Sequence, residues 1–426
     1  MKRVLIISPY FPPVNAADMH RVRTSLPYFE EFDWSAEVVA VDTRYSDMGQ
    51  DDLLLQSLPP TIKVHKVKAL NKGLTSKLGL GSIALRSLWY YRLYVNQLLK
   101  REKFDLIYFS TTQFPVCVLG AYWKRKFGVP YVIDMQDPWH SEYYRDKPKS
   151  QRPPKYWFSY RLNKYMEPMA LKKAEGLIAV SDQYITDLKN RYPQIKDIHA
   201  ATITFGMFAP DMDIAAAHER EFENLLDTAR INIVYVGRGG ADMHKAITPV
   251  FKALANGMRT DAGFFSRFKF YFIGTSYAPA GQGKPSIMPL AESFGLATAV
   301  TEITDRISYY RSLATLLQAD ALFVPGSDDA KYTASKIYPY LLARKPILAI
   351  FNKQSSAIGV LKETGINTVY NYEDISEQDI HGFLYALQTS PNKTISLNTD
   401  ALNAHSAQTK TGLQCALFNQ AIGQHA

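Results

Sequence analysis

The sequence predicts an α/β protein built from two doubly wound domains. Short apolar segments alternate with amphipathic ones in the first half, and the alternation restarts after a looser stretch near residue 208. A chain of 426 residues is also too long for one ordinary hydrophobic core. We predict domains at 1–207 and 208–396, and a helix within 397–426 that packs back across both. Ligands of doubly wound sheets bind at the carboxyl ends of strands, so we expect a binding cleft between facing domains.

The first half supplies the strands of one parallel sheet. Near-continuous β-branched runs are typical of strands buried on both faces. The candidate strands are Val4–Ile7, Glu37–Val41, Asp105–Phe109, Tyr131–Ile133 and Leu177–Val180. Apolar residues at helical spacing from Ala84 to Leu98 predict a helix, and Phe208–Met212 with Pro210 predicts a linker.

The second half repeats the pattern and predicts a second parallel sheet. Its candidate strands are Ile231–Val236, Lys269–Ile273, Ala299–Ile303, Ala321–Val324 and Ile347–Ile350. Its candidate helices are Ala246–Leu254, Tyr309–Gln318 and Ser335–Leu342.

A loop and helix start follow the strand at Ala321–Val324. Thr333 and Ser335 can cap the helix, and Lys336 adds a full charge where backbone N–H groups are unpaired. That combination suits a phosphate. The alternative is an ordinary capped surface helix.

A glycine turn opens the second domain after its first strand. Gly237 allows close approach to the backbone, and Arg238 and Lys245 are cations able to meet a phosphate. The turn is not a dinucleotide fingerprint, because Asp242 falls where the third glycine belongs and no acid ends the next strand. NAD binding is therefore not expected. The alternative is a turn with two solvated cations.

The formal net charge of +9 indicates acidic partners. Two stretches, Leu88–Arg92 and Lys155–Arg161, mix cations with tryptophan and tyrosine. That mixture suits an anionic membrane surface, although core-facing helices with solvated basic sides explain it equally. No nucleic-acid recognition motif is present in the sequence, so we expect no nucleic-acid partner.

Metal and redox signals are weak. Cys117 and Cys415 have no metal-like spacing, and neither Asp51-Asp52 nor Asp328-Asp329 is convincing as a metal site. We expect no metal and no cofactor. A reducing cytoplasm is the simplest compartment, with peripheral attachment to the inner face of the cell membrane as an option.

Several segments, in order, resemble a known family. They are the first loop Ser8–Pro13, the segment Asp134-Met135-Gln136-Asp137-Pro138-Trp139, the stretch 167–181, Gly237-Arg238 followed by Lys245, and Ser335-Lys336-Ile337-Tyr338 running to Leu348. Together they are similar to retaining glycosyltransferases of family four, which have the GT-B fold of two Rossmann-like domains.

The resemblance implies a nucleotide-sugar donor in the second domain and a glycan or lipid-linked glycan acceptor in the first, in bacterial surface polysaccharide synthesis. Its diphosphate would lie between Arg238, Lys245 and 333–336. A helix start and two cations can neutralise a leaving diphosphate without metal.

Candidate catalytic residues follow the strand Tyr131–Ile133. His140 titrates near neutral pH, and Asp137 can orient it or bind a sugar hydroxyl. Asn15 and His20 are candidates in the first loop, on the acceptor side. In the retaining mechanism usual for this fold the leaving phosphate can take the acceptor proton, so each residue can also be purely structural.

The chain departs from the family pattern at several positions. Lys331 and Pro339 replace two glutamates, Asn15-Ala16-Ala17 replaces paired glycines, and Lys245 lies two positions further from Arg238. Losing a charge-assisted bond to the donor ribose costs about 1.5–3 kcal/mol. These departures leave two alternatives open, a degenerate non-catalytic protein that binds a glycan or partner, and a nucleotide-sugar 2-epimerase of related fold.

Overall fold

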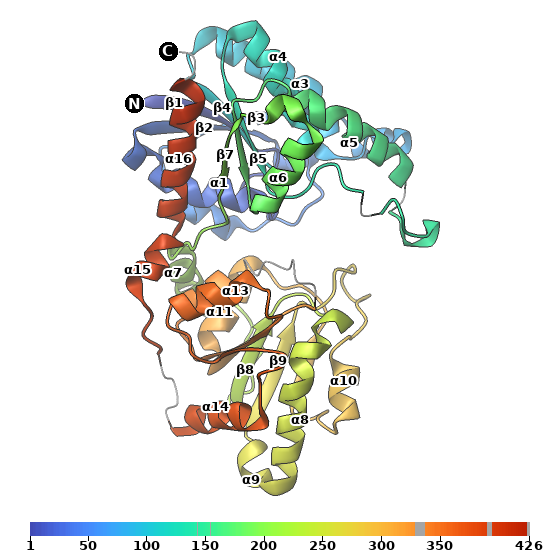
Figure 1. Ribbon diagram of the computed structural model, residues 1–426, viewed down its shortest axis with the longest axis vertical. Coiled ribbons are helices and arrows are strands. Elements are labelled where there is room, and N and C mark those ends of the chain that lie inside the picture. Colours follow the sequence, from blue (N-terminus) through green and yellow to red (C-terminus); the bar gives the residue numbers. More distant parts are fainter. Residues whose placement is uncertain (143, 154, 329–336, 390–393, 424–426) are drawn as a thin grey trace. The chain divides into compact units, whose positions relative to one another are not determined.

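The computed structural model describes residues 1–142, 144–153, 155–328, 337–389 and 394–423 (Figure 1). They form two compact units. The first unit comprises Met1–Gly206 and Ser406–Ala426, and the second comprises Met207–His405. The chain therefore passes between the units twice, once after β7 and once after α15.

A seven-stranded parallel sheet forms the centre of the first unit. Its strands follow the order β3-β2-β1-β4-β5-β6-β7, so the order reverses between β1 and β4. The strands are β1 Lys2–Ile7, β2 Trp34–Val41, β3 Lys63–Val67, β4 Leu106–Ser110, β5 Tyr131–Met135, β6 Gly176–Ala179 and β7 His199–Thr202. The central strands β4 and β5 are buried along their whole length, which explains their apolar sequences.

Helices cover both faces of this sheet (Figure 1). Side chains of α3, α4, α5 and α6 pack into one apolar cluster, and those of α1 and α16 pack into the other. The helices are α1 Met19–Ser25, α2 Lys72–Thr75, α3 Ile83–Arg101, α4 Val118–Phe127, α5 Tyr156–Leu171, α6 Asp182–Arg191 and α16 Ala407–Gly423.

The last helix, α16, belongs to the first unit. Phe418 is fully buried, and its ring centroid lies 4.9 Å from that of Tyr108 and 5.5 Å from that of Trp34. Gln414 Nε2 donates to Ser25 Oγ at 2.9 Å. The predicted terminal segment 397–426 thus contains two helices, of which the shorter, α15 Thr399–Ala404, lies in the second unit.

A six-stranded parallel sheet forms the second unit, in the order β10-β9-β8-β11-β12-β13. Its strand order reverses between β8 and β11. The strands are β8 Ile231–Val236, β9 Phe268–Ile273, β10 Val300–Ile303, β11 Ala321–Pro325, β12 Ile347–Phe351 and β13 Val369–Asn371. Two parallel sheets covered by helices confirm the predicted α/β class of two doubly wound domains.

The helices of the second unit begin with a correction. Phe208–Met212 was predicted as a linker, but α7 begins at Pro210, since proline fits the first helical position and Asp211 and Asp213 favour the helix N-terminus. The helices are α7 Pro210–Ala217, α8 His244–Thr260, α9 Ala262–Phe265, α10 Met288–Ser293, α11 Tyr309–Gln318, α12 Ile337–Leu342, α13 Ser356–Glu363, α14 Glu377–Thr389 and α15.

Candidate functional site

The carboxyl edge of the second sheet brings together two of the segments singled out in the sequence. The glycine turn follows β8 at the point where the strand order reverses, which is where doubly wound sheets bind ligands. Helix α12 reaches the same edge, because Tyr340 Oη accepts from Val236 N at 2.8 Å and donates to Val236 O at 3.0 Å. Helix α12 and the end of β8, where the glycine turn begins, are therefore neighbours in the fold.

Arg238 is held by a carboxylate in this structure. Its Nη1 donates to Asp242 Oδ1 at 3.0 Å, and its Nη2 donates to Asp242 Oδ2 at 2.5 Å. Ser327, which follows β11, donates to the same carboxylate at 2.6 Å. The hydrogen bond from Arg238 lowers the pKa of Asp242 below its usual value. Asp242 thus joins the loops after β8 and β11, on the two sides of the strand reversal.

Two glycines of this turn are needed for packing within the protein. A Cβ on Gly239 would lie 2.6 Å from Ser286 Oγ and 2.9 Å from Thr275 Cβ. Gly240 has φ of 151°, which side chains disfavour, and a Cβ there would meet the Asp242 carboxylate. The close approach that we expected for a ligand is taken up at Gly239 by the segment between β9 and α10, and at Gly240 by Asp242 of the same turn.

Of the remaining predicted donor residues outside the glycine turn, the structure describes Lys245. Lys245 is exposed in the first turn of α8. Thr333, Ser335 and Lys336 lie outside the described residues, as does Lys331. Pro339 is the third residue of the described helix α12, and Ala343 N donates to its carbonyl at 3.0 Å. A proline in the first helical turn is tolerated.

A pocket of about 400 Å³ opens in the first unit, beside the carboxyl ends of β4 and β5. Its walls come from the segment before α3, from the residues after each of these strands, and from α5. The lining residues are Gly79, Ser82, Leu85, Thr112, Gln113, Phe114, Pro115, Asp137, Pro138, Trp139, Phe158, Ser159, Leu162 and Asn163. Of the predicted catalytic and acceptor residues, Asp137 lines this pocket.

The protein environment of Asp137 favours the protonated, neutral form of its carboxyl group more than bulk water does. Burial raises the pKa of its carboxyl, and the charge of nearby Asp18 adds to the effect. Asp18 is itself buried and accepts from Thr111 Oγ1 at 2.7 Å and from Thr112 N at 3.0 Å. These bonds tie the loops after β1 and β4 together across the strand reversal.

The first aspartate of the Asp-x-x-Asp segment has a different role. Asp134 is fully buried, and its Oδ2 lies 2.7 Å from Nε of Arg21, which is also buried. Ser110 Oγ and Gln136 Nε2 donate to the same carboxylate. Asp134 is therefore part of an internal network under the pocket loops.

His140 is not among the residues that line the pocket, although the preceding residue Trp139 is. Its ring is buried 4.9 Å from that of Tyr160, and neither ring nitrogen has a hydrogen-bond partner among the described residues. Its backbone N donates to Glu167 Oε1 at 3.0 Å, and Glu167 also accepts from Arg191 and Tyr192. Burial lowers the pKa of His140, which favours the neutral imidazole.

The two candidates of the first loop are held by local contacts. Asn15 N donates to Gly49 O at 2.8 Å, which fixes the loop against the segment before the 3-10 helix Asp52–Ser57. His20 Nδ1 lies 3.0 Å from Nη2 of Arg23, and Arg23 is buried. Neither Asn15 nor His20 is among the residues that line the pocket.

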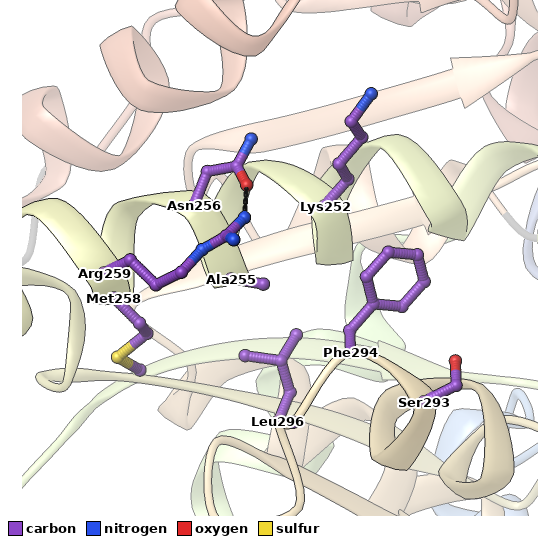
Figure 2. A pocket seen from close by; sticks show the side chains of 9 residues that line it. Lys252, Ala255, Asn256, Met258, Arg259, Ser293, Phe294 and Leu296 are labelled. Atoms are coloured by element: carbon purple, nitrogen blue, oxygen red, sulfur yellow. Dashed lines mark hydrogen bonds between the residues drawn. The ribbon is translucent and has the colours of Figure 1, made fainter.

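A second pocket, of about 510 Å³, lies in the second unit between α8 and the segment after α10 (Figure 2). Lys252 and Arg259 come from the second half of α8, while Phe294 and Leu296 precede β10. This half of α8 lies toward the amino ends of the strands. The pocket is therefore separate from the predicted donor residues.

The outer surface of α3, α4 and α5 is basic and aromatic. Trp89 and Trp157 are 58 % and 65 % exposed, whereas the other three tryptophans are buried. Arg92 and Arg161 lie over these two rings, at 5.6 Å and 6.0 Å from the centroids. The one acid in the three helices, Glu167, is fully buried. We call this surface the basic aromatic face.

The described residues contain neither a metal-binding cluster nor a helix able to span a membrane. Within them, no group of three or more His, Cys, Asp or Glu side chains is placed to hold a metal ion. No helix in the same residues has both the length and the apolarity that crossing a bilayer requires.

Solved structures share the architecture over the whole chain. Anabaena HepE in complex with UDP has 16 % identity and a TM-score of 0.51, covering 100 % of this chain and 99 % of its own. An α,α-trehalose-phosphate synthase from Burkholderia xenovorans, with glucose-6-phosphate, has 12 % identity and a TM-score of 0.54 over 98 % and 100 %. TarM from S. aureus, in complex with UDP and glycan ligands, has 11 % identity and a TM-score of 0.54 over 98 % and 100 %. At these identities the likeness establishes the fold.

Residues 63–203 match the family model described as Glycosyltransferase Family 4. The chain therefore has the two-domain GT-B fold, and its residues 63–203 resemble the glycosyltransferases of family 4. The matched range lies wholly in the first unit and includes Asp137 and the residues of α5 that line its pocket. No curated protein matched the sequence.

Sequence reasoning missed several residues of these sites. In the sequence, Asp242 was interpreted only as the residue that replaces the third glycine of a dinucleotide-binding motif. Its spacing of four residues from Arg238 was a signal for the ion pair that the structure shows. Phe158 lies in the stretch Lys155–Arg161, which was interpreted only as basic and aromatic, and Leu162 and Asn163 follow it directly. Their spacing of four and five residues indicates one inward face of α5.

Proposed function

We propose that this glycosyltransferase moves a sugar from a nucleotide-sugar donor to a hydroxyl of a glycan or lipid-linked glycan, with retention of configuration, in bacterial surface polysaccharide synthesis. The main support is the position of Arg238, a cation on a glycine turn at the strand reversal of the second sheet. The UDP complexes of HepE and TarM are consistent with such a donor.

In this proposal the donor diphosphate binds at Gly237, Arg238 and Lys245, together with Thr333, Ser335 and Lys336. Charge develops on the diphosphate as the glycosidic bond breaks, and fixed cations stabilise it. Arg238 offers two parallel N–H groups that match a phosphate. Asp242 occupies this fork in the structure, so the diphosphate must share or displace that carboxylate.

The acceptor is assigned to the first unit. Asp137 is the candidate that contacts the acceptor, because it lines a pocket at the carboxyl edge of the sheet. His140 is assigned to the support of the same loop, since its buried ring packs on Tyr160 and its backbone is fixed by Glu167. The phosphate of the donor then takes the acceptor proton, and no protein base is required.

A non-catalytic glycan-binding protein is the second candidate. Pro339 favours it, because this residue stands where the family has a glutamate and cannot accept a hydrogen bond through its side chain. A donor held without that bond binds more weakly, by about tenfold to a hundredfold.

Nucleotide binding by the full chain separates these two candidates. We expect one of UDP, GDP, ADP or CMP to raise the melting temperature selectively, with or without EDTA, because a ligand stabilises the state that binds it. Replacing Arg238→Ala should raise the Kd for that nucleotide about tenfold or more. Arg259→Ala, in the pocket away from the donor residues, is the matched control. An absence of shift at millimolar nucleotide would favour the non-catalytic protein.

We also propose that the enzyme works on an anionic membrane surface, as a peripheral protein on the inner face of the cell membrane. The basic aromatic face supports this proposal, because exposed tryptophan and arginine suit the headgroup layer and no exposed acid of α3, α4 or α5 opposes anionic lipid. A lipid-linked acceptor would be presented at the same surface.

A further inference from the structure

We infer that the pocket beside Asp137 binds an uncharged sugar ring of the acceptor, and that it excludes acidic sugars and phosphates. The inference rests on the proposed function and adds to it the chemical class of the acceptor. It is carried by the composition of the pocket walls, by the unpaired carboxylate at Asp137, and by the absence of a cation among the described lining residues.

The pocket walls combine polar side chains with apolar, largely aromatic ones. Leu85, Phe114, Trp139, Phe158 and Leu162 contribute to them. One face of a pyranose ring consists of C–H groups, which pack against aromatic and aliphatic side chains, while its hydroxyls point outward around the rim. A pocket with apolar walls and a few polar groups is the usual form of a site for a small organic ligand.

The polar groups around these walls are neutral, with one exception. Ser82, Gln113 and Ser159 offer hydroxyl and amide groups, and Asp137 is the one charged residue in the described lining. No hydrogen bond to the Asp137 carboxylate occurs in the part of the chain that the structure describes. A carboxylate in this position can accept from two sugar hydroxyls, which are stronger bonds than neutral pairs form.

The charge of the pocket contrasts with that of its surroundings. The chain carries +9 overall, and Lys155 lies near the pocket wall, yet Lys155 Nζ is turned to Ser76 O at 2.8 Å. An acidic ligand would therefore meet Asp137 and, behind it, Asp18 without a compensating cation from the described lining. Asp137 is exposed, so solvent screens this repulsion between like charges, and its effect on an acidic ligand is moderate. This arrangement disfavours uronates, nucleotides and lipid phosphates here.

The aromatic walls are fixed before any ligand binds. The rings of Phe114 and Trp139 stack with centroids 5.4 Å apart, and Trp139 Nε1 donates to Asn163 Oδ1 at 3.1 Å. Gly79 allows the segment before α3 to close against Phe158, since a Cβ there would lie 3.0 Å from the ring. Rigid walls reduce the entropic cost of binding.

The inference can be tested with soluble sugars on the full chain. Saturation-transfer NMR would compare the methyl glycosides of glucose, galactose, mannose and N-acetylglucosamine with methyl glucuronide. We expect at least one neutral glycoside to bind and methyl glucuronide to bind at least tenfold more weakly. Phe158→Ala should reduce neutral binding about tenfold through loss of a wall.

Asp137→Asn provides a reciprocal test that a structural role would not reproduce. Removing the charge should weaken the neutral glycoside by about tenfold and strengthen methyl glucuronide, because one hydrogen-bond acceptor is weakened and a repulsion is removed. Asp187→Asn, an exposed acid of α6, is the matched control.

Three outcomes would overturn the inference. They are equal binding of methyl glucuronide by the unmodified protein, unchanged binding by both pocket variants, and no binding of any neutral glycoside while a nucleotide still raises the melting temperature. Loss of nucleotide binding as well would overturn the proposed function together with the inference.

Discussion

At the scale of single residues, two aspartates of one motif have different surroundings. Asp134, near the end of β5, forms a buried ion pair with Arg21. Asp137, three positions later, lines a pocket. The sequence identified both aspartates, but it gave no way to assign the two roles. Burial decides between them, and burial depends on Arg21, more than 110 positions earlier in the chain.

The buried imidazole of His140 should make stability depend on pH. Burial lowers its pKa in the folded state below the ordinary value of 6.5, so between the two pKa values the unfolded chain binds a proton that the folded chain does not. Stability is then complete above about pH 6.5 and falls as the pH drops through this window, by up to about 1.4 kcal/mol per pH unit.

Urea unfolding between pH 5 and pH 8 measures this effect. The variant His140→Asn should lose stability less steeply below pH 6.5 than the unmodified protein. His199→Asn, in β7 of the same unit, controls for the removal of a histidine. Equal slopes for the unmodified protein and His140→Asn would rule out His140 as the source.

At the scale of elements, the buried strands were predicted, and of the edge strands only β10, as Ala299–Ile303, was predicted with them. Strand β4 is apolar throughout because both of its faces are covered, so its sequence alone reveals it. Strand β3, with the sequence Lys-Val-His-Lys-Val, lies at one edge and is partly exposed. Strands β7 and β13 are edge strands too, and their short, mixed sequences carry no periodic signal.

The candidate sites were predictable to a similar extent. The strand ends that carry Arg238 and Asp137 follow from the order of apolar runs, since ligands bind at the carboxyl ends of parallel strands. The sequence could not reveal that Gly239 is needed for contact with Thr275 and Ser286, because those residues are distant in the chain. Contacts between loops of different strands depend on the complete fold.

Helix α16 should stabilise the first unit through one side chain above all. Phe418→Ala removes a fully buried ring that contacts Trp34 and Tyr108, and should lower the unfolding free energy by about 3–5 kcal/mol. Leu413→Ala, at a site 45 % exposed on the same helix, should cost much less. Chemical denaturation of both variants checks this, and equal losses would contradict the role of Phe418.

At the scale of the whole molecule, the charge of the chain is distributed unevenly. Exposed cations such as Arg92, Lys126 and Arg161 lie on the basic aromatic face, where exposed acids are lacking on all three helices. The stripe Trp157, Arg161, Tyr165 and Met169 continues along α5 at steps of four residues, which places it on one side of the helix.

Binding to vesicles should therefore depend on lipid charge and on salt. We expect the protein to sediment with phosphatidylcholine vesicles that contain phosphatidylglycerol, and to be released when salt is raised from 0.1 to 0.5 M. The double variant Trp157→Ser and Arg161→Ser should bind at least fivefold more weakly, since one basic residue contributes roughly 1 kcal/mol.

The second unit offers a matched control for this experiment. Tyr277 is 67 % exposed and Arg306 lies over its ring at 4.6 Å, so Tyr277→Ser with Arg306→Ser removes a similar pair away from the basic aromatic face. Binding to pure phosphatidylcholine with equal affinity, or binding that is insensitive to salt, would argue against an electrostatic membrane contact.

The return of the chain to its first unit has a consequence for engineering. Helix α16 packs on the first sheet, in the same apolar cluster as side chains of β1 and α1. The second unit is therefore topologically an insertion between β7 and α16. Its two ends meet, since Met207 N donates to His405 O at 2.8 Å. Segment 207–405 can therefore be exchanged as one cassette between related enzymes while both termini stay unchanged. Under the proposed assignment of the donor to the second unit and the acceptor to the first, such chimaeras would combine the nucleotide preference of one enzyme with the acceptor preference of another through two splice points.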